Sequence, residues 1–356
     1  METSLCFTSA LEYWHVARVA DGPTERANPV ARRTPLDFAR EHQAVLDKTP
    51  SSAETALLTR ALGQFAPAQL SDGILDVDGL TRPLHVLVGP EGTRRKTNDR
   101  IPHRGQTPLP ENSLVRVEDG LEVASPEFVY LQMAAQLDEV SLIWLASELC
   151  SVFTVHPMLG GGLLPARPLT DLKTMTLYLE NAARQNAYGA KKALRAVAHA
   201  VECAASRREL SCALRMSLPR AMGGRAIPKP QLNVPISLDR RLASVYGQRT
   251  ISVDLCWPEQ MVALEFDSDT YHLAGRRRAH DNDKRGILEE MGWRVTPLSS
   301  EQLDSLGLAD NAFRRVAGYL GVKDRSKETR YDWQGRRSDL LRRLWQYEKV
   351  GVCNEL

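Results

Sequence analysis

Residues 250–272 of this 356-residue chain read TISVDLCWPEQMVALEFDSDTYH. The stretch contains two short runs rich in apolar and β-branched residues, Thr250–Cys256 and Met261–Asp267. Runs of this length, bounded by turn-forming residues, are typical of β-strands. Pro258 lies between them and has no amide hydrogen, so it cannot continue a central strand. The stretch therefore predicts two short strands joined by a turn.

Acidic side chains lie on both predicted strands. Glu265 and Asp267 are two residues apart, so they share one face of their strand. Asp254 lies on the neighbouring strand, and we expect the three carboxylates to converge at the end of the sheet. Oxygen ligands of this kind suit a hard divalent cation such as Mg²⁺, which keeps other positions for water and phosphate.

The residues that follow predict an α/β unit. Residues 276–291 are expected to form a helix, with Ile287 and Leu288 on its apolar side and Gly292 at its end. Residues 294–298 then predict a strand, and residues 309–320 predict a helix from their three- and four-residue apolar spacing. From Ser206 onward the order is helix, three strands, helix, strand, helix.

The same region resembles a known family of nucleases. The resemblance is carried by Asp254, by Glu265-Phe266-Asp267, by His272, and by DNDKR at 281–285 and GWRV at 292–295. These residues resemble the small domains related to very-short-patch-repair endonucleases (DUF559-like), which belong to the PD-(D/E)XK superfamily. The resemblance implies a restriction-endonuclease-like core over residues 205–321, in which these elements form a mixed sheet flanked by helices.

The resemblance implies a role for each matching residue. Asp254 takes the first acidic position, Glu265 the second, and Glu209 that of the glutamate on the preceding helix. Asp267 stands where the wider superfamily has lysine. That departure is typical of the repair-endonuclease branch, in which His272 is implied as the base. A second departure is Ser268, where that branch usually has glycine.

The expected site has three parts. The candidate catalytic residues are Glu209, Asp254, Glu265, His272 and Lys284. The implied cofactor is Mg²⁺ or Mn²⁺, held by Asp254, Glu265 and the carbonyl of Phe266. The residues expected to contact DNA phosphates are Arg276, Arg277, Arg278 and Arg285.

Each candidate also has an ordinary structural interpretation. Ser206 and Glu209 fit the pattern S-x-x-E, a capping box in which Glu209 only satisfies the backbone at a helix start. Asp254 and Asp267 flank turns, where aspartate often accepts backbone hydrogen bonds. His272 could be a surface or packing residue. The ordered set, rather than any single residue, favours the nuclease interpretation.

Charge is distributed unevenly along the chain. The net charge is +2, but residues 1–200 carry 20 Lys and Arg against 23 Asp and Glu, whereas residues 201–356 carry 26 against 21. The halves are therefore −3 and +5. Pairs such as Arg336-Arg337 and Arg342-Arg343 could contact phosphate, although arginine pairs most often lie on solvated helix faces. The excess is far below that of a strongly basic DNA-binding domain.

The N-terminal half predicts strands at residues 84–89 and 113–117, a further extended stretch from Gly120, and a helix over residues 126–137 that Ser125 caps. Residues 80–160 resemble AbiEi-like proteins of abortive-infection toxin–antitoxin systems. His85 and His103 have no partner set in the sequence and are expected to be scaffold residues. Residues 160–162 are a glycine run without the Lys-Ser/Thr of a phosphate-binding loop.

Four segments are expected in all. They are an N-terminal α+β domain over residues 1–165, a helical linker over 166–204, the nuclease-like core over 205–321 and a basic helical tail over 322–356. The tail could dock on the core or on DNA. Its residues Leu340, Leu344 and Tyr347 share one helical face, which favours docking on the core.

Cysteine usage and hydropathy predict a cytoplasmic location. The six cysteines form no C-x-x-C pair and have no nearby histidine pattern, so a structural zinc site is not expected. No charged-then-apolar leader and no run of about 18 apolar residues is present in the sequence, so no membrane association is expected.

The sequence as a whole predicts an α/β, metal-dependent DNA endonuclease in a bacterial defence, toxin–antitoxin or repair context. The main alternative is a nuclease-fold DNA-binding antitoxin or transcriptional regulator that has lost cleavage. A third is a scaffold that binds a toxin or another protein through the N-terminal half. The choice between DNA and RNA stays open.

Overall fold

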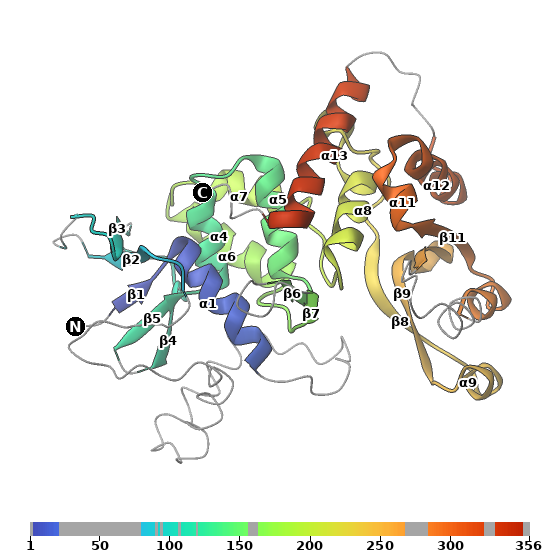
Figure 1. The fold of residues 1–356 in the computed structure, drawn as a ribbon, viewed down its shortest axis with the longest axis horizontal. Coiled ribbons are helices and arrows are strands. Elements are labelled where there is room, and N and C mark those ends of the chain that lie inside the picture. The colour runs from blue at the N-terminus through green and yellow to red at the C-terminus, as the bar shows by residue number, and fades with distance from the viewer. Residues whose placement is uncertain are drawn as a thin grey trace. The chain divides into compact units, whose positions relative to one another are not determined.

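The protein has mixed α/β structure and divides into two compact units, Met1–Ala200 and Val201–Leu356 (Figure 1). The computed structural model describes residues 3–20, 80–89, 92, 95–105, 108–118, 120–155, 163–267, 284–323 and 332–351. Within these ranges, no helix is both long and apolar enough to cross a membrane.

The first unit is built on a mixed five-stranded sheet. Its strand order is β3-β2-β1-β5-β4, with β1 paired parallel to β5 and antiparallel to β2. The strands are β1 Thr3–Leu5, β2 Leu84–Val88, β3 Arg100–Arg104, β4 Leu114–Glu118 and β5 Leu121–Ala124. The predicted strands at 84–89 and 113–117 are therefore confirmed as β2 and β4, and the extended stretch from Gly120 as β5.

Helices complete the first unit. They are α1 Phe7–Ala20, α4 Pro126–Met133, α5 Glu139–Leu149, α6 Leu172–Arg184 and α7 Ala190–Val197. A short hairpin of β6 Phe153–Val155 and β7 Leu163–Pro165 lies between α5 and α6. Ser125 caps α4 as predicted, its hydroxyl accepting from the amide of Phe128 at 3.2 Å. The segment expected to be a helical linker, residues 166–204, belongs to this unit as far as Ala200, because α7 packs on α5 and α6 packs on α7 and α4.

The second unit is built on a four-stranded sheet with the order β11-β10-β9-β8. The strands are β8 Gln231–Ser237, β9 Thr250–Trp257, β10 Val262–Asp267 and β11 Arg294–Ser299. The predicted pair of strands is confirmed as the antiparallel pair β9 and β10. Pro258 lies in the connection, η3 Pro258–Gln260, as its missing amide hydrogen requires. β11 pairs parallel to β10, and Pro297 is tolerated there because β11 is an edge strand.

Helices cover this sheet in the order that the sequence predicts, with two short α-helices added besides the 3₁₀ helix η2. The helices are α8 Arg207–Ser217, η2 Arg220–Met222, α9 Arg240–Tyr246, α11 Ser300–Asp304, α12 Leu306–Tyr319 and α13 Trp333–Val350. A further helix is described over residues 284–290. Its Ile287 and Leu288 enter a buried cluster with Val253, Ala263 and Trp293, which fixes this helix on the sheet. The additions are α9, between β8 and β9 (Figure 1), and α11.

The C-terminal helix α13 docks on the core of the second unit, on α8 and η2. Leu340, Leu344 and Tyr347 are buried, which confirms the docking interpretation. Trp333 is also buried at the start of α13 and donates to the carbonyl of Gly224 at 3.0 Å. The helix therefore belongs to the folded core rather than to a separate basic tail.

Arg337 departs from the expectation that the arginines of α13 face outward. It is buried and forms an ion pair with Asp310 of α12, which also receives Arg225 at 2.8 Å. The two arginine side chains are 7% exposed and that of Asp310 is 15% exposed, so water screens these charges little. Arg337 therefore contributes to packing and is not free to contact phosphate.

Replacing Asp310 tests this docking. In Asp310→Asn, two buried guanidinium groups lose their shared counter-charge, and we expect the free energy of unfolding of the second unit to fall by about 3 kcal/mol. Urea denaturation followed by tryptophan fluorescence measures the change. The matched control is Asp339→Asn, which removes an exposed pair with Arg342 on the same helix and is expected to cost under about 1 kcal/mol. Equal losses in the two variants would contradict the buried-pair interpretation.

Candidate functional site

Asp254 and Glu265 face each other across two central strands. The register pairs Leu255 of β9 with Leu264 of β10, which places Asp254 beside Glu265. Their carboxylates also bind the opposite backbone. The amide of Phe266 donates to Asp254 Oδ2 at 2.8 Å, and the amide of Asp254 lies 3.3 Å from Glu265 Oε1. The expected convergence of these two carboxylates is therefore present.

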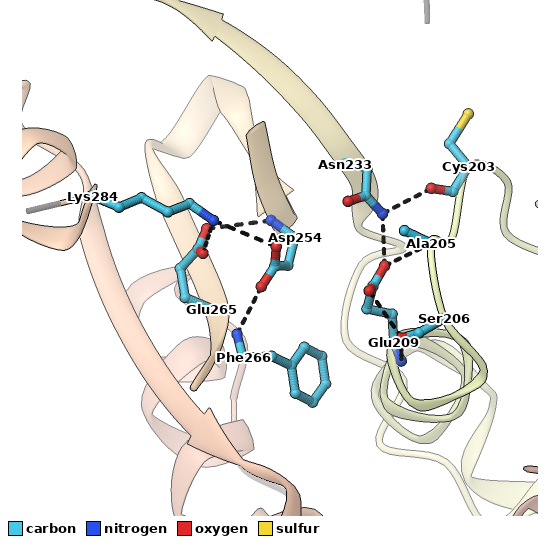
Figure 2. Close-up of polar contacts among 9 residues, drawn as sticks. All are labelled: Cys203, Ala205, Ser206, Glu209, Asn233, Asp254, Glu265, Phe266 and Lys284. Carbon is cyan, nitrogen blue, oxygen red and sulfur yellow. Dashed lines mark hydrogen bonds and ion pairs between the residues drawn. The ribbon is translucent and has the colours of Figure 1, made fainter. Parts of the chain in front are cut away.

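Lys284 brings a positive charge to this pair (Figure 2). Its ammonium group contacts Glu265 Oε2 and lies 3.5 Å from Asp254 Oδ1. The side chain of Lys284 is 17% exposed and that of Glu265 is 9% exposed, so this is a largely buried ion cluster. All four carboxylate oxygens thus have a partner, two on the backbone and two on one ammonium.

Burial controls the protonation of the cluster. Burial, and next the charge of Asp254, raise the pKa of Glu265 above its ordinary value, and the charge of Lys284 opposes this rise. Burial alone would lower the pKa of Lys284, but the two carboxylates outweigh it and raise that pKa. The ammonium therefore stays charged at neutral pH. Perturbed groups of this kind, facing each other, are typical of functional sites.

Glu209 lies at the start of α8, and three donors hold its carboxylate. The amide of Ala205 and the side-chain nitrogen of Asn233 donate to Oε2 at 2.8 and 2.6 Å, and the hydroxyl of Ser206 donates to Oε1 at 2.9 Å. Burial, and then the charge of Asp254, raise the pKa of Glu209 to about 7 despite these hydrogen bonds. Glu209 therefore has the protonation equilibrium of a general acid or base at neutral pH.

The structure also shows Glu209 taking part in the cap at the start of α8. Ser206 is the N-cap of α8 and accepts from the amide of Glu209 at 3.2 Å. Glu209 reaches back one residue further than in a capping box, to the amide of Ala205. Capping does not account for the bond from Asn233, which comes from a strand.

The other predicted site residues divide into two groups. His272, Arg276, Arg277 and Arg278 lie outside the described residues, as does the side chain of Asp267. Arg285 is described as half-buried in the helix over residues 284–290. Lys284 was expected to neutralise phosphate, and the structure pairs it with the two acidic candidates instead. Asn233 was not among the predicted residues, because no motif singles out an asparagine within a strand.

The donors of the site fit Mg²⁺ or Mn²⁺ better than a zinc-type site. Among the described residues, no group of three or more His, Cys, Asp or Glu side chains is arranged to hold a metal ion. Asp254 and Glu265 together offer two carboxylates, which is the usual share of protein ligands in an Mg²⁺ site. The carbonyl of Phe266, expected as a third ligand, follows Glu265 directly in β10.

Comparison with known proteins leaves the family open. No protein-family model matches the chain, and no solved structure matches it significantly. Two uncharacterized proteins of Mycobacterium tuberculosis, from strains CDC 1551 / Oshkosh and ATCC 25618 / H37Rv, are each 28% identical over 72 residues. That match covers 20% of this chain and 24% of each relative, so it spans about a quarter of their length.

The raised pKa of Glu209 predicts how stability depends on pH. Between its ordinary pKa of 4.5 and about 7, the folded protein keeps a proton that the unfolded chain has lost. Stability from this group is therefore greatest below pH 4.5 and falls as pH rises towards 7. We expect Glu209→Gln to flatten this fall in melting temperature, because a glutamine amide can donate to Ser206 while its oxygen still accepts from Ala205 and Asn233.

Thermal melts at several pH values between 5 and 8 measure this effect in the metal-free protein. The matched control is Glu259→Gln, because Glu259 is exposed in the connection between β9 and β10. A Glu209→Gln protein whose melting temperature fell with pH as steeply as the wild type would show that Glu209 does not retain its proton.

Proposed function

We propose that the second unit is a metal-dependent nuclease that hydrolyses phosphodiester bonds in DNA. The observation that carries the proposal is the pair of carboxylates of Asp254, which is half-buried, and Glu265, which is buried. They are opposed on adjacent strands and contacted by the ammonium of Lys284. The resemblance to the repair-endonuclease branch of the PD-(D/E)XK superfamily supports it. In that branch, Asp254 and Glu265 match the two acidic positions.

The residues of the site have complementary roles in this proposal. Asp254, Glu265 and the Phe266 carbonyl would hold Mg²⁺ or Mn²⁺, which supplies charge stabilisation at the phosphate and favours ionisation of a nearby water. After its ammonium leaves the two carboxylates, Lys284 would donate hydrogen bonds to the phosphate. Glu209, with a pKa of about 7, would orient the attacking water or exchange its proton. His272 is proposed as the base from the resemblance alone.

The wider setting is part of the same proposal. Arg276, Arg277, Arg278 and Arg285 would contact the DNA backbone, which supplies affinity independent of sequence. The resemblance of residues 80–160 to AbiEi-like proteins supports a role in defence, toxin–antitoxin function or repair in a bacterial cytoplasm. A toxin or another protein partner would then bind the first unit.

Cleavage assays test the proposal directly. We expect supercoiled, linear or mismatched DNA to be cleaved in Mg²⁺ or Mn²⁺, and Asp254→Asn to lose about 100-fold or more of this activity because it removes a charged ligand at constant size. His272→Ala is expected to lose activity as well. Glu259→Gln serves as the control with wild-type activity. Full cleavage by Asp254→Asn would refute the proposed site.

The second candidate is a DNA-binding regulator that does not cleave. One observation favours it: Lys284 already contacts both carboxylates, and each of their four oxygens has a partner. In a regulator of this kind, the ammonium of Lys284 would always occupy the position that a metal ion takes in a nuclease. DNA binding without cleavage at any metal concentration would support the regulator.

Lys284→Met separates the two candidates. Without the ammonium, two buried like charges repel, and we expect the metal-free variant to lose about 2–4 kcal/mol of stability. If the protein is a nuclease, Mn²⁺ would raise the melting temperature of Lys284→Met more than that of the wild type, because no ammonium competes with the cation for the carboxylates of the folded protein. DNA cleavage would still fall. The control is Lys323→Met, which removes an exposed lysine. If Mn²⁺ stabilised Lys284→Met no more than the wild type, the regulator would be favoured.

A further inference from the structure

We propose that Asn233 is a positioning residue of this site, one that holds the carboxylate of Glu209 in fixed relation to Asp254 and Glu265. The inference rests on the proposed nuclease function and names a residue that neither the motif nor the resemblance singles out.

The backbone of Asn233 adopts an unusual conformation for a strand residue. Its φ is 51°, in the left-handed region, although it lies inside β8. Its neighbours Leu232 and Val234 pair with Leu255 and Val253, so Asn233 lies opposite Asp254. Asparagine adopts the left-handed region more readily than other residues besides glycine, but this conformation is uncommon inside a strand. Such outliers cluster at functional sites, and this one is next to a candidate catalytic aspartate.

The side chain of Asn233 makes two hydrogen bonds with its amide nitrogen. One goes to Glu209 Oε2 at 2.6 Å and the other to the carbonyl of Cys203 at 2.9 Å. Both partners are acceptors, so the orientation of the amide follows from chemistry, and both of its hydrogens are used. Figure 2 shows this amide reaching from β8 to the segment that begins α8.

The other donors to Glu209 cannot set its place relative to the sheet. Ala205 and Ser206 belong to the start of the same helix, so they move with Glu209 if the helix moves. Of the three donors, Asn233 alone belongs to the sheet that carries Asp254 and Glu265. Misplacing a catalytic group by about 1 Å costs on the order of 100-fold in rate. A fixed link between the helix and the sheet is therefore what a catalytic role of Glu209 requires.

Two substitutions of Asn233 separate this role from simple packing. Asn233→Gly keeps the left-handed backbone without strain and deletes the amide, whereas Asn233→Asp keeps the size and replaces the donor by a second carboxyl group. In the full-length protein we expect both variants to fold, with kcat for DNA cleavage reduced about tenfold or more and KM nearly unchanged. The matched control is Asn186→Gly, an exposed left-handed asparagine of the first unit with φ 56°, which should cleave at the wild-type rate.

A second measurement does not depend on cleavage. Carbon-13 NMR of the Glu209 carboxyl, assigned with Glu209→Gln, should titrate at higher pH in Asn233→Gly than in the wild type, because a donor to the charged form is lost. Folded Asn233 variants with wild-type kcat would overturn the inference. If the wild type does not cleave DNA, the proposed function fails, and the catalytic part of the inference fails with it. The Glu209 titration then decides separately whether Asn233 holds the Glu209 carboxylate, and an unchanged titration in Asn233→Gly would refute that link.

Discussion

Two carboxylates that face each other on adjacent strands repel, and burial removes the water that would screen them. The sheet of the second unit therefore needs a counter-charge between Asp254 and Glu265, and Lys284 supplies it from the helix over residues 284–290. This helix is held on the sheet by Ile287 and Leu288. Apolar packing and ion pairing thus place the same helix, and the parallel crossover from β10 to β11 brings the ammonium to the carboxylates.

The same row of residues links structure to chemistry. Asn233, Asp254 and Glu265 lie opposite one another on β8, β9 and β10, and Glu209 is tied to this row from α8. The carboxyl group of Glu209 has a pKa of about 7, and the pKa of Glu265 is also raised, in both cases chiefly because of burial. Perturbed carboxyl groups that lie near one another mark this row as the candidate site.

The basic character of the C-terminal half has a partly structural origin. Arg225 and Arg337 are used to hold Asp310 and to stack near Trp333, at ring-centroid distances of 5.5 and 4.7 Å. These arginines stabilise the docking of α13 on the core. A net positive charge counted along the sequence therefore overstates the charge available to bind phosphate.

The sequence by itself determined the local elements of this protein. Strand periodicity and Pro258 predicted β9, β10 and their connection, while Ser125 and Ser206 marked helix starts that the structure confirms. The sequence also predicted that the carboxylates of Asp254 and Glu265 lie close together. Only the tertiary structure decided that Lys284 forms ion pairs with both of them, that Asn233 binds Glu209 and that Arg337 is buried. These partners are separated by long stretches of chain, 19 residues for Lys284 and Glu265 and 24 for Asn233 and Glu209, and they meet because helices dock on a sheet. Periodicity reports which face a residue lies on, but not which distant side chain will meet it there.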